Sequence, residues 1–186
     1  VKTPKEMISL SLGVPGLHNV MNALAALAVA DVLGVPLALA AGKLSEFSGF
    51  ARRLQIVDRN GLTLIDDSYN ASPDSMRSAI DVLSTRQVPG RKAAVLADML
   101  ELGPDSPKFH GQVGEFAAGC PVDQYFLIGA QIRFLGEALE KAGKPVLYFT
   151  DNVTAAAAVK DWAKPGDTVL FKGSNGMKLG EVLKEL

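Results

Sequence analysis

The chain has 186 residues, 48% of them hydrophobic and 21% charged, which is typical of a folded globular protein and excludes an intrinsically disordered one. Its 19 basic and 20 acidic residues give a formal net charge of −1, so nothing indicates a partner held mainly through nucleic-acid phosphates or anionic lipid. The single cysteine cannot form an internal disulfide, which fits a reducing compartment.

The sequence predicts neither a membrane span nor a signal peptide. Its longest apolar stretch, Ala23 to Ala30, has eight residues, whereas a membrane-spanning helix needs about 20. No basic segment followed by a hydrophobic core stands at the start. Because the chain begins at Val1 and not at methionine, we expect a processed protein or, as the better interpretation, a piece of a longer one.

Residues 1–47 predict one strand and two helices. The strand is expected over Glu6 to Leu12, a helix closed by Gly34 over Asn19 to Leu33, and a second helix over Pro36 to Phe47. One strand and two helices have no sheet partner of their own and cannot bury enough surface. We therefore interpret residues 1–47 as the tail of a preceding domain.

Residues 48–186 predict a complete α/β domain. Two short strands, Leu54 to Asp58 and Leu62 to Asp66, flank Asn60-Gly61, which tolerates the positive φ angles of a tight hairpin turn. After them helices and strands alternate, with helices expected over 73–85, 106–119, 132–142, 153–163 and from 176, and strands over 93–97, 125–128, 146–149 and 168–171. Such alternation favours a doubly wound, mostly parallel sheet.

In a parallel sheet of this kind, ligands bind beyond the carboxyl ends of the strands. The residues expected there are Asp66-Asp67, Asp98, Gly129, Thr150 and Lys172-Gly173-Ser174. Carboxylates at such a position accept hydrogen bonds from sugar hydroxyls or hold a metal. The alternative for Asp66 is that it only caps the turn toward the helix at Pro73.

Two stretches with basic or hydroxyl-bearing side chains also have two interpretations each. Lys172-Gly173-Ser174 is either an anion site near a helix N-terminus or a loop with a cap. Arg52-Arg53, at the expected domain boundary, is either solvated surface or a phosphate clamp.

Polar residues early in the first helix predict a base-reading face. Asn19 and Asn22 lie one helical turn apart, next to His18, and two amides on one face can donate to and accept from a base edge. The alternative is that Asn19 is only an N-cap. His110 is expected to be a packed or capping histidine, and Cys120 is not expected to be catalytic.

Several motifs are absent. The sequence contains no Gly-x-x-x-x-Gly-Lys-Ser/Thr, Gly-x-Gly-x-x-Gly, Gly-x-Ser-x-Gly or His-Glu-x-x-His. The chain therefore carries no complete set of residues for phosphoryl transfer, hydride transfer or hydrolysis.

Three motifs, taken together, resemble the Mur ligases, the ATP-dependent amide ligases of peptidoglycan precursor synthesis. They are Gly16-Leu17-His18-Asn19-Val20-Met21-Asn22-Ala23-Leu24-Ala25-Ala26, Asp66-Asp67-Ser68-Tyr69-Asn70-Ala71-Ser72-Pro73, and Asp98-Met99-Leu100-Glu101-Leu102-Gly103. Lys172-Gly173-Ser174, followed by a Gly-Met pair, fits the end of the same enzymes. The resemblance is collinear over essentially the whole chain.

The resemblance implies a fold and a reaction. Residues 1–47 would end a central ATPase domain, and residues 48–186 would form the Rossmann-like C-terminal domain. ATP would phosphorylate a carboxylate of UDP-N-acetylmuramoyl tripeptide, and the amino group of D-Ala-D-Ala would attack the acyl phosphate. The catalytic residues, the P-loop and the Mg²⁺ ligands would lie upstream of Val1, leaving this chain without a metal site and inactive alone. The resemblance further implies a cytoplasmic monomer without nucleic-acid partners or membrane insertion.

Residue roles are also implied by position. The ATP-binding residues would be His18, Asn19 and Asn22 at the adenine, Arg53 toward the phosphates and Asp67 at the ribose hydroxyls. Asn70, Lys172 and Ser174 would lie near the incoming dipeptide.

The sequence departs from the family pattern at three positions and leaves two alternatives open. Ala97 replaces a usual glycine, Asn175 a usual arginine and Gly180 a frequent glutamate, so no cationic dipeptide contact is carried over to Asn175. A doubly wound domain without a catalytic set could instead be a nucleotide- or small-ligand-binding module. A ligase similar to folylpolyglutamate synthase would share the C-terminal architecture, but the Asp-Asp-Ser-Tyr-Asn-Ala and Glu-Leu-Gly stretches favour the peptidoglycan enzyme.

Overall fold

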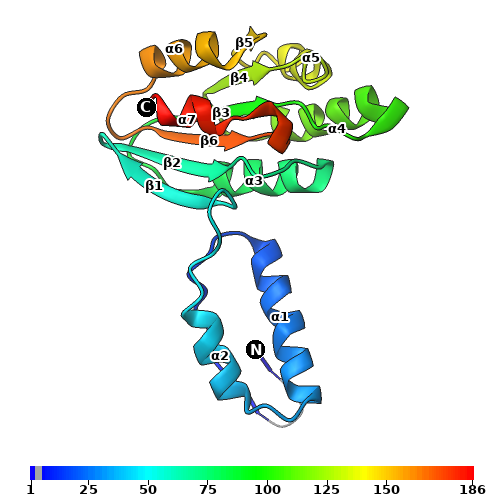
Figure 1. The fold of residues 1–186 in the computed structure, drawn as a ribbon, viewed down its shortest axis with the longest axis vertical. Coiled ribbons are helices and arrows are strands. Elements are labelled where there is room, and N and C mark those ends of the chain that lie inside the picture. Colours follow the sequence, from blue (N-terminus) through cyan, green and yellow to red (C-terminus); the bar gives the residue numbers. More distant parts are fainter. Residues whose placement is uncertain (3–5) are drawn as a thin grey trace. The chain divides into compact units, whose positions relative to one another are not determined.

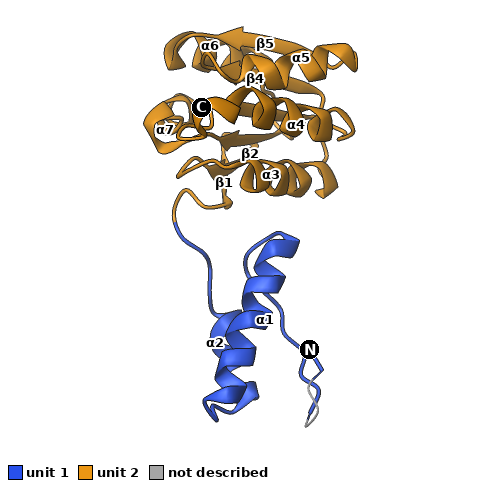
Figure 2. Ribbon diagram, turned by 90° about the vertical axis from the view of Figure 1, so that its right-hand side faces the viewer, with its two compact units in different colours: residues 1–50 blue, residues 51–186 orange. Residues whose placement is uncertain are grey.

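A computed structural model describes residues 1–2 and 6–186, which divide into two compact units, Val1–Phe50 and Ala51–Leu186 (Figure 2). Within this described part of the chain, no helix is both long and apolar enough to cross a membrane.

The first unit consists of two helices and an extended segment that precedes them. Helix α1 spans Leu17–Val32 and α2 spans Leu37–Ser45, close to the expected ranges. The two helices pack around a small buried cluster of Leu27, Leu37 and Ala41. This small core leaves many apolar side chains of the unit exposed, among them Met21, Val29, Val32 and Leu33.

The strand expected over Glu6 to Leu12 is wrong. Among the described residues of this segment, the structure has only an isolated bridge between Lys2 and Met7. A strand is stabilised by hydrogen bonds to a neighbouring strand, and the described part of this unit otherwise contains helices. The alternating sequence therefore stays extended without a ladder.

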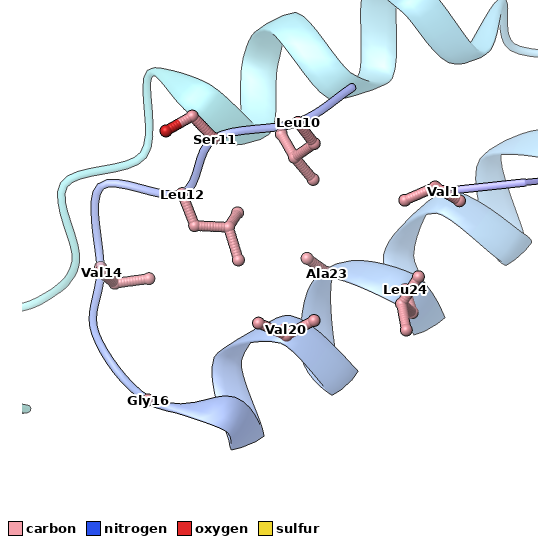
Figure 3. Close-up of a pocket in the computed structure, with 9 residues that line it drawn as sticks. All are labelled: Val1, Leu10, Ser11, Leu12, Val14, Gly16, Val20, Ala23 and Leu24. Carbon is pink, nitrogen blue, oxygen red and sulfur yellow. The ribbon is translucent and has the colours of Figure 1, made fainter. Parts of the chain in front are cut away.

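The extended segment and α1 enclose an open, largely apolar pocket of about 500 Å³ (Figure 3). The side chains of Leu12, Val20 and Ala23 lie around it. Among the described residues, no charged side chain lines the pocket, and the one charged group near it is the terminal amino group of Val1. The pocket is thus a gap in the packing of the first unit, without an arrangement of polar side chains that could bind a ligand.

The second unit is a six-stranded sheet covered by helices on both faces (Figure 1). Its strands are β1 (Gln55–Arg59), β2 (Leu62–Asp67), β3 (Lys92–Ala97), β4 (Gln124–Ile128), β5 (Val146–Phe149) and β6 (Thr168–Lys172). Its α-helices are α3 (Pro73–Thr85), α4 (Ser106–Ala118), α5 (Arg133–Lys141), α6 (Asn152–Trp162) and α7 (Gly180–Lys184). These elements confirm the predicted α/β class.

The strand order is β1-β2-β6-β3-β4-β5. Strand β1 pairs with β2 in an antiparallel hairpin, and the other neighbouring pairs are parallel. The chain reaches the edge at β5 and then returns, so that β6 lies between β2 and β3. This return places the carboxyl ends of β2, β6 and β3 side by side.

Alternation along the central strands divides the core into two layers. On β3, Ala94 and Leu96 face the layer under α3, α4 and α5, whereas Ala93, Val95 and Ala97 face the layer under α6 and α7. Strands buried on both faces read as continuous apolar runs, which is why the sequence shows them as short hydrophobic stretches.

Local turn chemistry fixes the ends of several elements. Asn60 and Gly61 both have positive φ angles, +53° and +79°, and close the predicted hairpin. Ser72 caps α3 in a reciprocal capping box with Ser75, with a proline at the first helical position. These two features confirm predictions made from the residue types alone.

The last helix begins later than expected. Instead of a helix from Gly176, the chain forms a short 3₁₀ turn over Asn175–Met177, and α7 starts at Gly180. Lys178 between them has a φ angle of +54°, in the left-handed region that an α-helix does not use. Ser174 therefore precedes the short 3₁₀ turn, and the N-terminus of α7 lies farther along the chain, at Gly180.

Candidate functional site

The site is built from the carboxyl ends of β2, β6 and β3. Asp67 ends β2 and Lys172 ends β6, and the two are direct partners in the parallel register. Asp98 follows β3 immediately. The structure thus places three of the expected strand ends side by side, whereas Gly129 and Thr150 follow β4 and β5, farther along the sheet.

Asp67 and Lys172 form an ion pair with an Oδ2–Nζ distance of 2.6 Å. The Lys172 side chain is only 2% exposed and that of Asp67 14%. Lys172 Nζ also donates to the carbonyl oxygen of Asn70 at 2.9 Å, and Asp67 Oδ1 accepts from the backbone N–H of Leu54 at 3.1 Å. Burial lowers the pKa of Lys172, opposed by Asp67 and assisted by the nearby Arg53 charge.

Asp66 has a different role from its neighbour. Its Oδ1 atom accepts hydrogen bonds from the backbone N–H of Ser68 at 3.1 Å and from the Ser68 hydroxyl at 2.6 Å. The carboxylate is buried and closes the turn after β2. The cap of α3 comes from Ser72 instead, so Asp66 stabilises the turn and not the helix start.

Two arginines stand beside this turn. The Arg52 guanidinium donates to the Ser68 carbonyl oxygen at 2.6 Å and to Asn175 Oδ1 at 3.0 Å. The Arg53 guanidinium lies over the Tyr69 ring, 4.2 Å from its centre. Arg52 joins two loops and is not simply solvated surface. Arg53 is exposed, and its guanidinium lies on an aromatic face close enough to Lys172 to affect its pKa.

Sequence reasoning missed Tyr69. Its ring is 46% exposed although it follows directly after the buried turn. The signal that could have revealed it is an aromatic residue within the polar stretch Asp66-Asp67-Ser68-Tyr69-Asn70, at the end of a strand.

Ser174 and Asp98 connect the ends of β6, β3 and β4. Ser174 N–H donates to the Asp98 carbonyl oxygen at 3.1 Å, and Ser174 Oγ accepts from the backbone N–H of Leu100 at 2.9 Å. The Asp98 carboxylate accepts from the backbone N–H groups of Ala130 and Ile132. Ser174 is 4% exposed, so its hydroxyl serves the loop that follows β3.

The three residues expected near the dipeptide, Asn70, Lys172 and Ser174, have protein partners. Asn70 Oδ1 accepts from the backbone N–H of Ala71 at 2.9 Å, and the Asn70 carbonyl oxygen accepts from Lys172. Asn70 itself is exposed at the surface, whereas Lys172 and Ser174 are buried.

The base-reading residues expected in the first unit lie on α1. Asn19 Nδ2 donates to the Pro15 carbonyl oxygen at 2.7 Å, and Asn22 Nδ2 lies 3.5 Å from Asn19 Oδ1. Gly16, not Asn19, is the N-cap of α1, so the capping interpretation of Asn19 is wrong. The extended segment ends at Gly16, whose φ angle of +99° suits glycine, and the helix begins two residues earlier than expected. The two amides do share one helical face, next to His18.

His110 and Cys120 have structural roles. His110 is fully buried, its Nε2 accepts from the backbone N–H of Met99, and its Nδ1 faces the Ser106 carbonyl oxygen at 2.8 Å. Cys120 is a buried free thiol whose pKa is raised by burial. The burial and hydrogen bonds of His110 agree with its interpretation as a packed histidine.

Comparison with known proteins assigns the domain. The family model described as "Mur ligase, glutamate ligase domain" matches residues 52–175. The chain therefore belongs to the Mur ligase family, and both the resemblance and the fold class predicted from the sequence are confirmed.

Several curated relatives carry the name UDP-N-acetylmuramoyl-tripeptide–D-alanyl-D-alanine ligase, among them those of Bacillus subtilis and Escherichia coli. The Bacillus subtilis protein is 40% identical over 174 residues, covering 92% of this chain and 38% of that protein. The Escherichia coli protein is 34% identical over 191 aligned positions, which cover 100% of this chain and 40% of that protein. The chain thus spans about 40% of the length of these relatives.

Solved structures support the same relationship. The crystal structure of MurF from Acinetobacter baumannii matches 99% of this chain and 40% of that chain, with a TM-score of 0.88 and 30% identity. The MurF ligase from Thermotoga maritima in complex with ADP matches 92% of this chain and 38% of that chain, with a TM-score of 0.77 and 26% identity.

Proposed function

We propose that this chain is part of an ATP-dependent ligase that joins D-Ala-D-Ala to UDP-N-acetylmuramoyl tripeptide in peptidoglycan precursor synthesis. The observation that carries the proposal is the 40% identity, over 92% of the chain, to the Bacillus subtilis protein of that name. The ADP complex of the Thermotoga maritima relative supports an adenine nucleotide as reactant.

The proposed reaction has two steps. A carboxylate oxygen of the tripeptide attacks the γ-phosphorus of ATP, ADP leaves, and an acyl phosphate forms. The amino nitrogen of D-Ala-D-Ala then attacks the acyl carbon, phosphate leaves, the amide bond forms, and the nitrogen loses a proton.

Residues of this chain are assigned to binding, not to bond breaking. Asn19 and Asn22, with His18 beside them, carry the donors and acceptors that read an adenine edge. The Asp67 carboxylate can accept from both hydroxyls of a ribose, and the Arg53 guanidinium matches a phosphate.

The dipeptide contacts are assigned more narrowly than the sequence implied. Asn70, exposed after the Asp66 turn, is the assigned contact, with Ser174 holding the adjacent loop through Leu100. Lys172 is buried between Asp67 and Asn70 and is not assigned to the dipeptide.

Mg²⁺ would accompany ATP. In the part of the chain that the structure describes, no group of three or more His, Cys, Asp or Glu side chains could hold a metal ion. We therefore assign the metal ligands and the P-loop to the share of the relatives' length that this chain does not span. In this proposal residues 1–47 end the central ATPase domain and residues 48–186 form the C-terminal ligase domain of a cytoplasmic monomer.

The test is a ligase assay on the full-length gene product with UDP-N-acetylmuramoyl tripeptide, D-Ala-D-Ala and ATP. We expect phosphate release that requires both substrates, and a product heavier by one D-Ala-D-Ala unit. Nucleotide binding without turnover would favour a binding module, and glutamate addition to a folate would favour the folylpolyglutamate alternative. Residues 1–186 alone should show no turnover, because the sequence lacks the loop that cradles the β- and γ-phosphates.

A further inference from the structure

Lys172 is unusual among the cations at the strand ends because its charge is enclosed. Its side chain is 2% exposed, and its ammonium group contacts Asp67 Oδ2 at 2.6 Å and the Asn70 carbonyl oxygen at 2.9 Å. A buried charge is retained only where partners compensate for its lost hydration. Because the side chain is 2% exposed, a dipeptide could reach this ammonium group only if the residues that cover it moved.

The two contacts of Lys172 fix the group that would meet the nucleotide. Asp67 is held at Oδ2 by Lys172, on the neighbouring strand, and at Oδ1 by the backbone N–H of Leu54. Each carboxylate oxygen therefore has a partner from a different element, and the plane of the carboxylate is set before any ligand binds. The second Lys172 contact ties the segment after β2 to the same point through Asn70.

Arg53 is a third charged residue close to the Asp67–Lys172 ion pair. Arg53, stacked on Tyr69, lies close enough to lower the pKa of Lys172. Arg53 is the residue assigned to the phosphates. Lys172 supplies the counter-charge of Asp67 from the neighbouring strand, so this role does not fall to Arg53.

We propose that Lys172 is a positioning residue for the nucleotide: it orients Asp67 and anchors the 68–72 segment, and it does not bind the dipeptide. This inference rests on the proposed function, because it takes Asp67 as the ribose ligand.

The test compares four forms of the full-length protein by calorimetric titration with ADP: wild type, Asp67→Asn, Lys172→Met and the double variant. Methionine keeps the length of the lysine stem without its charge. Each single variant should weaken ADP binding about 10- to 100-fold, because the free energy of one hydrogen bond to a charged group corresponds to a change of about this size in affinity. Because Lys172 acts through Asp67, the double variant should bind ADP within about twofold of Asp67→Asn.

Kinetics supply the second readout. Lys172→Met should raise the KM for ATP by the same factor as its loss of ADP affinity, and should leave the KM for D-Ala-D-Ala within about twofold. Arg91→Met is the matched control, because it breaks another ion pair, Arg91–Asp167, at the amino end of β6. Arg91→Met should lower the free energy of unfolding without weakening ADP binding.

Any of three results would overturn the proposal. Lys172→Met could raise the KM for D-Ala-D-Ala without weakening ADP binding, or it could leave the affinity for ADP unchanged. The third is a double variant whose loss of ADP affinity equals the product of the losses in the two single variants. If Lys172→Met does not fold, Lys172→Gln replaces it in the titration and in the kinetics, with the same expected and contrary results. A wild type that binds ADP but forms no dipeptide product would refute the proposed ligase, while the ADP titrations would still decide the role of Lys172.

Discussion

His110 Nε2 accepts a hydrogen bond from the backbone N–H of Met99 at 3.0 Å, inside the layer covered by α4. The other ring nitrogen, Nδ1, faces the Ser106 carbonyl oxygen and donates to it. This arrangement requires the neutral ring with its proton on Nδ1. The histidine thereby holds the start of the 98–105 loop, whose next residue, Leu100, donates to Ser174.

Stability should therefore fall in mild acid. Burial lowers the pKa of His110, against smaller raising effects from Ser106 and Asp98. The unfolded chain then binds a proton more readily than the folded one, so the stabilisation is complete above about pH 6.5 and is lost as the pH falls toward the folded pKa, by up to about 1.4 kcal/mol per pH unit. Urea unfolding measured at a series of pH values checks this.

The controls use the two histidines of the chain. His110→Gln should be less stable at neutral pH but should lose the slope between about pH 6.5 and 5. His18→Gln should keep the slope. A wild-type stability that is constant over this range would contradict the assignment.

A second prediction concerns Asp167, at the opposite end of the sheet. Its side chain is 5% exposed and accepts from Arg91 and from the backbone N–H groups of Arg91 and Lys164. Burial opposes its charged form, but these donors together lower its pKa. Asp167→Ala should cost about 3 kcal/mol of unfolding free energy, because it leaves buried donors without an acceptor.

Asp74→Ala is the comparison for that measurement. Asp74 pairs with Arg77 one turn along α3, but its side chain is 96% exposed. Its removal should cost less than about 1 kcal/mol. Equal losses in the two variants would mean that the Asp167 network contributes no more than a surface pair.

The two units should differ in local stability. The first unit has a buried cluster of three residues, whereas the second has two extended layers around its sheet. Hydrogen exchange on the 186-residue chain should show low protection before Ser48 and high protection in β3 and β6. Equal, high protection on both sides of Ser48 would contradict a boundary there. The stretch 51–186 should also fold when expressed alone.

The sequence was most informative where structure is set locally. Asn60-Gly61 predicts its turn because these residue types tolerate positive φ angles, and Ser72-Pro73 predicts a helix start from its own side chains. The alternating strand over Glu6 to Leu12 failed for the opposite reason. A strand depends on a neighbour, and periodicity does not reveal whether one exists.

The candidate site was predictable in composition but not in contacts. Strand order follows from where β6 inserts, and β6 lies far from β2 in sequence, so the Asp67–Lys172 pair could not be read from spacing. The same is true of Arg52 and Asn175, whose hydrogen bond depends on the 3₁₀ turn after β6. Residue types at strand ends indicate a site, whereas the partner of each residue depends on the fold.

The last prediction separates the adjacent carboxylates Asp66 and Asp67. Asp66→Asn keeps an oxygen that can accept from both groups of Ser68, so its unfolding free energy should change by less than about 1 kcal/mol and the KM for ATP of the full-length protein by less than about threefold. Asp67→Asn leaves the Lys172 charge buried without a counter-charge, so it should cost about 3 kcal/mol. It should also raise the KM for ATP about 10- to 100-fold, because the carboxylate proposed to bind the ribose loses its charge. Urea unfolding of the 186-residue chain and ATP kinetics of the full-length protein measure the two effects. A larger loss for Asp66→Asn in both measurements would reverse the assignment of the pair, because it would make the turn residue the nucleotide ligand.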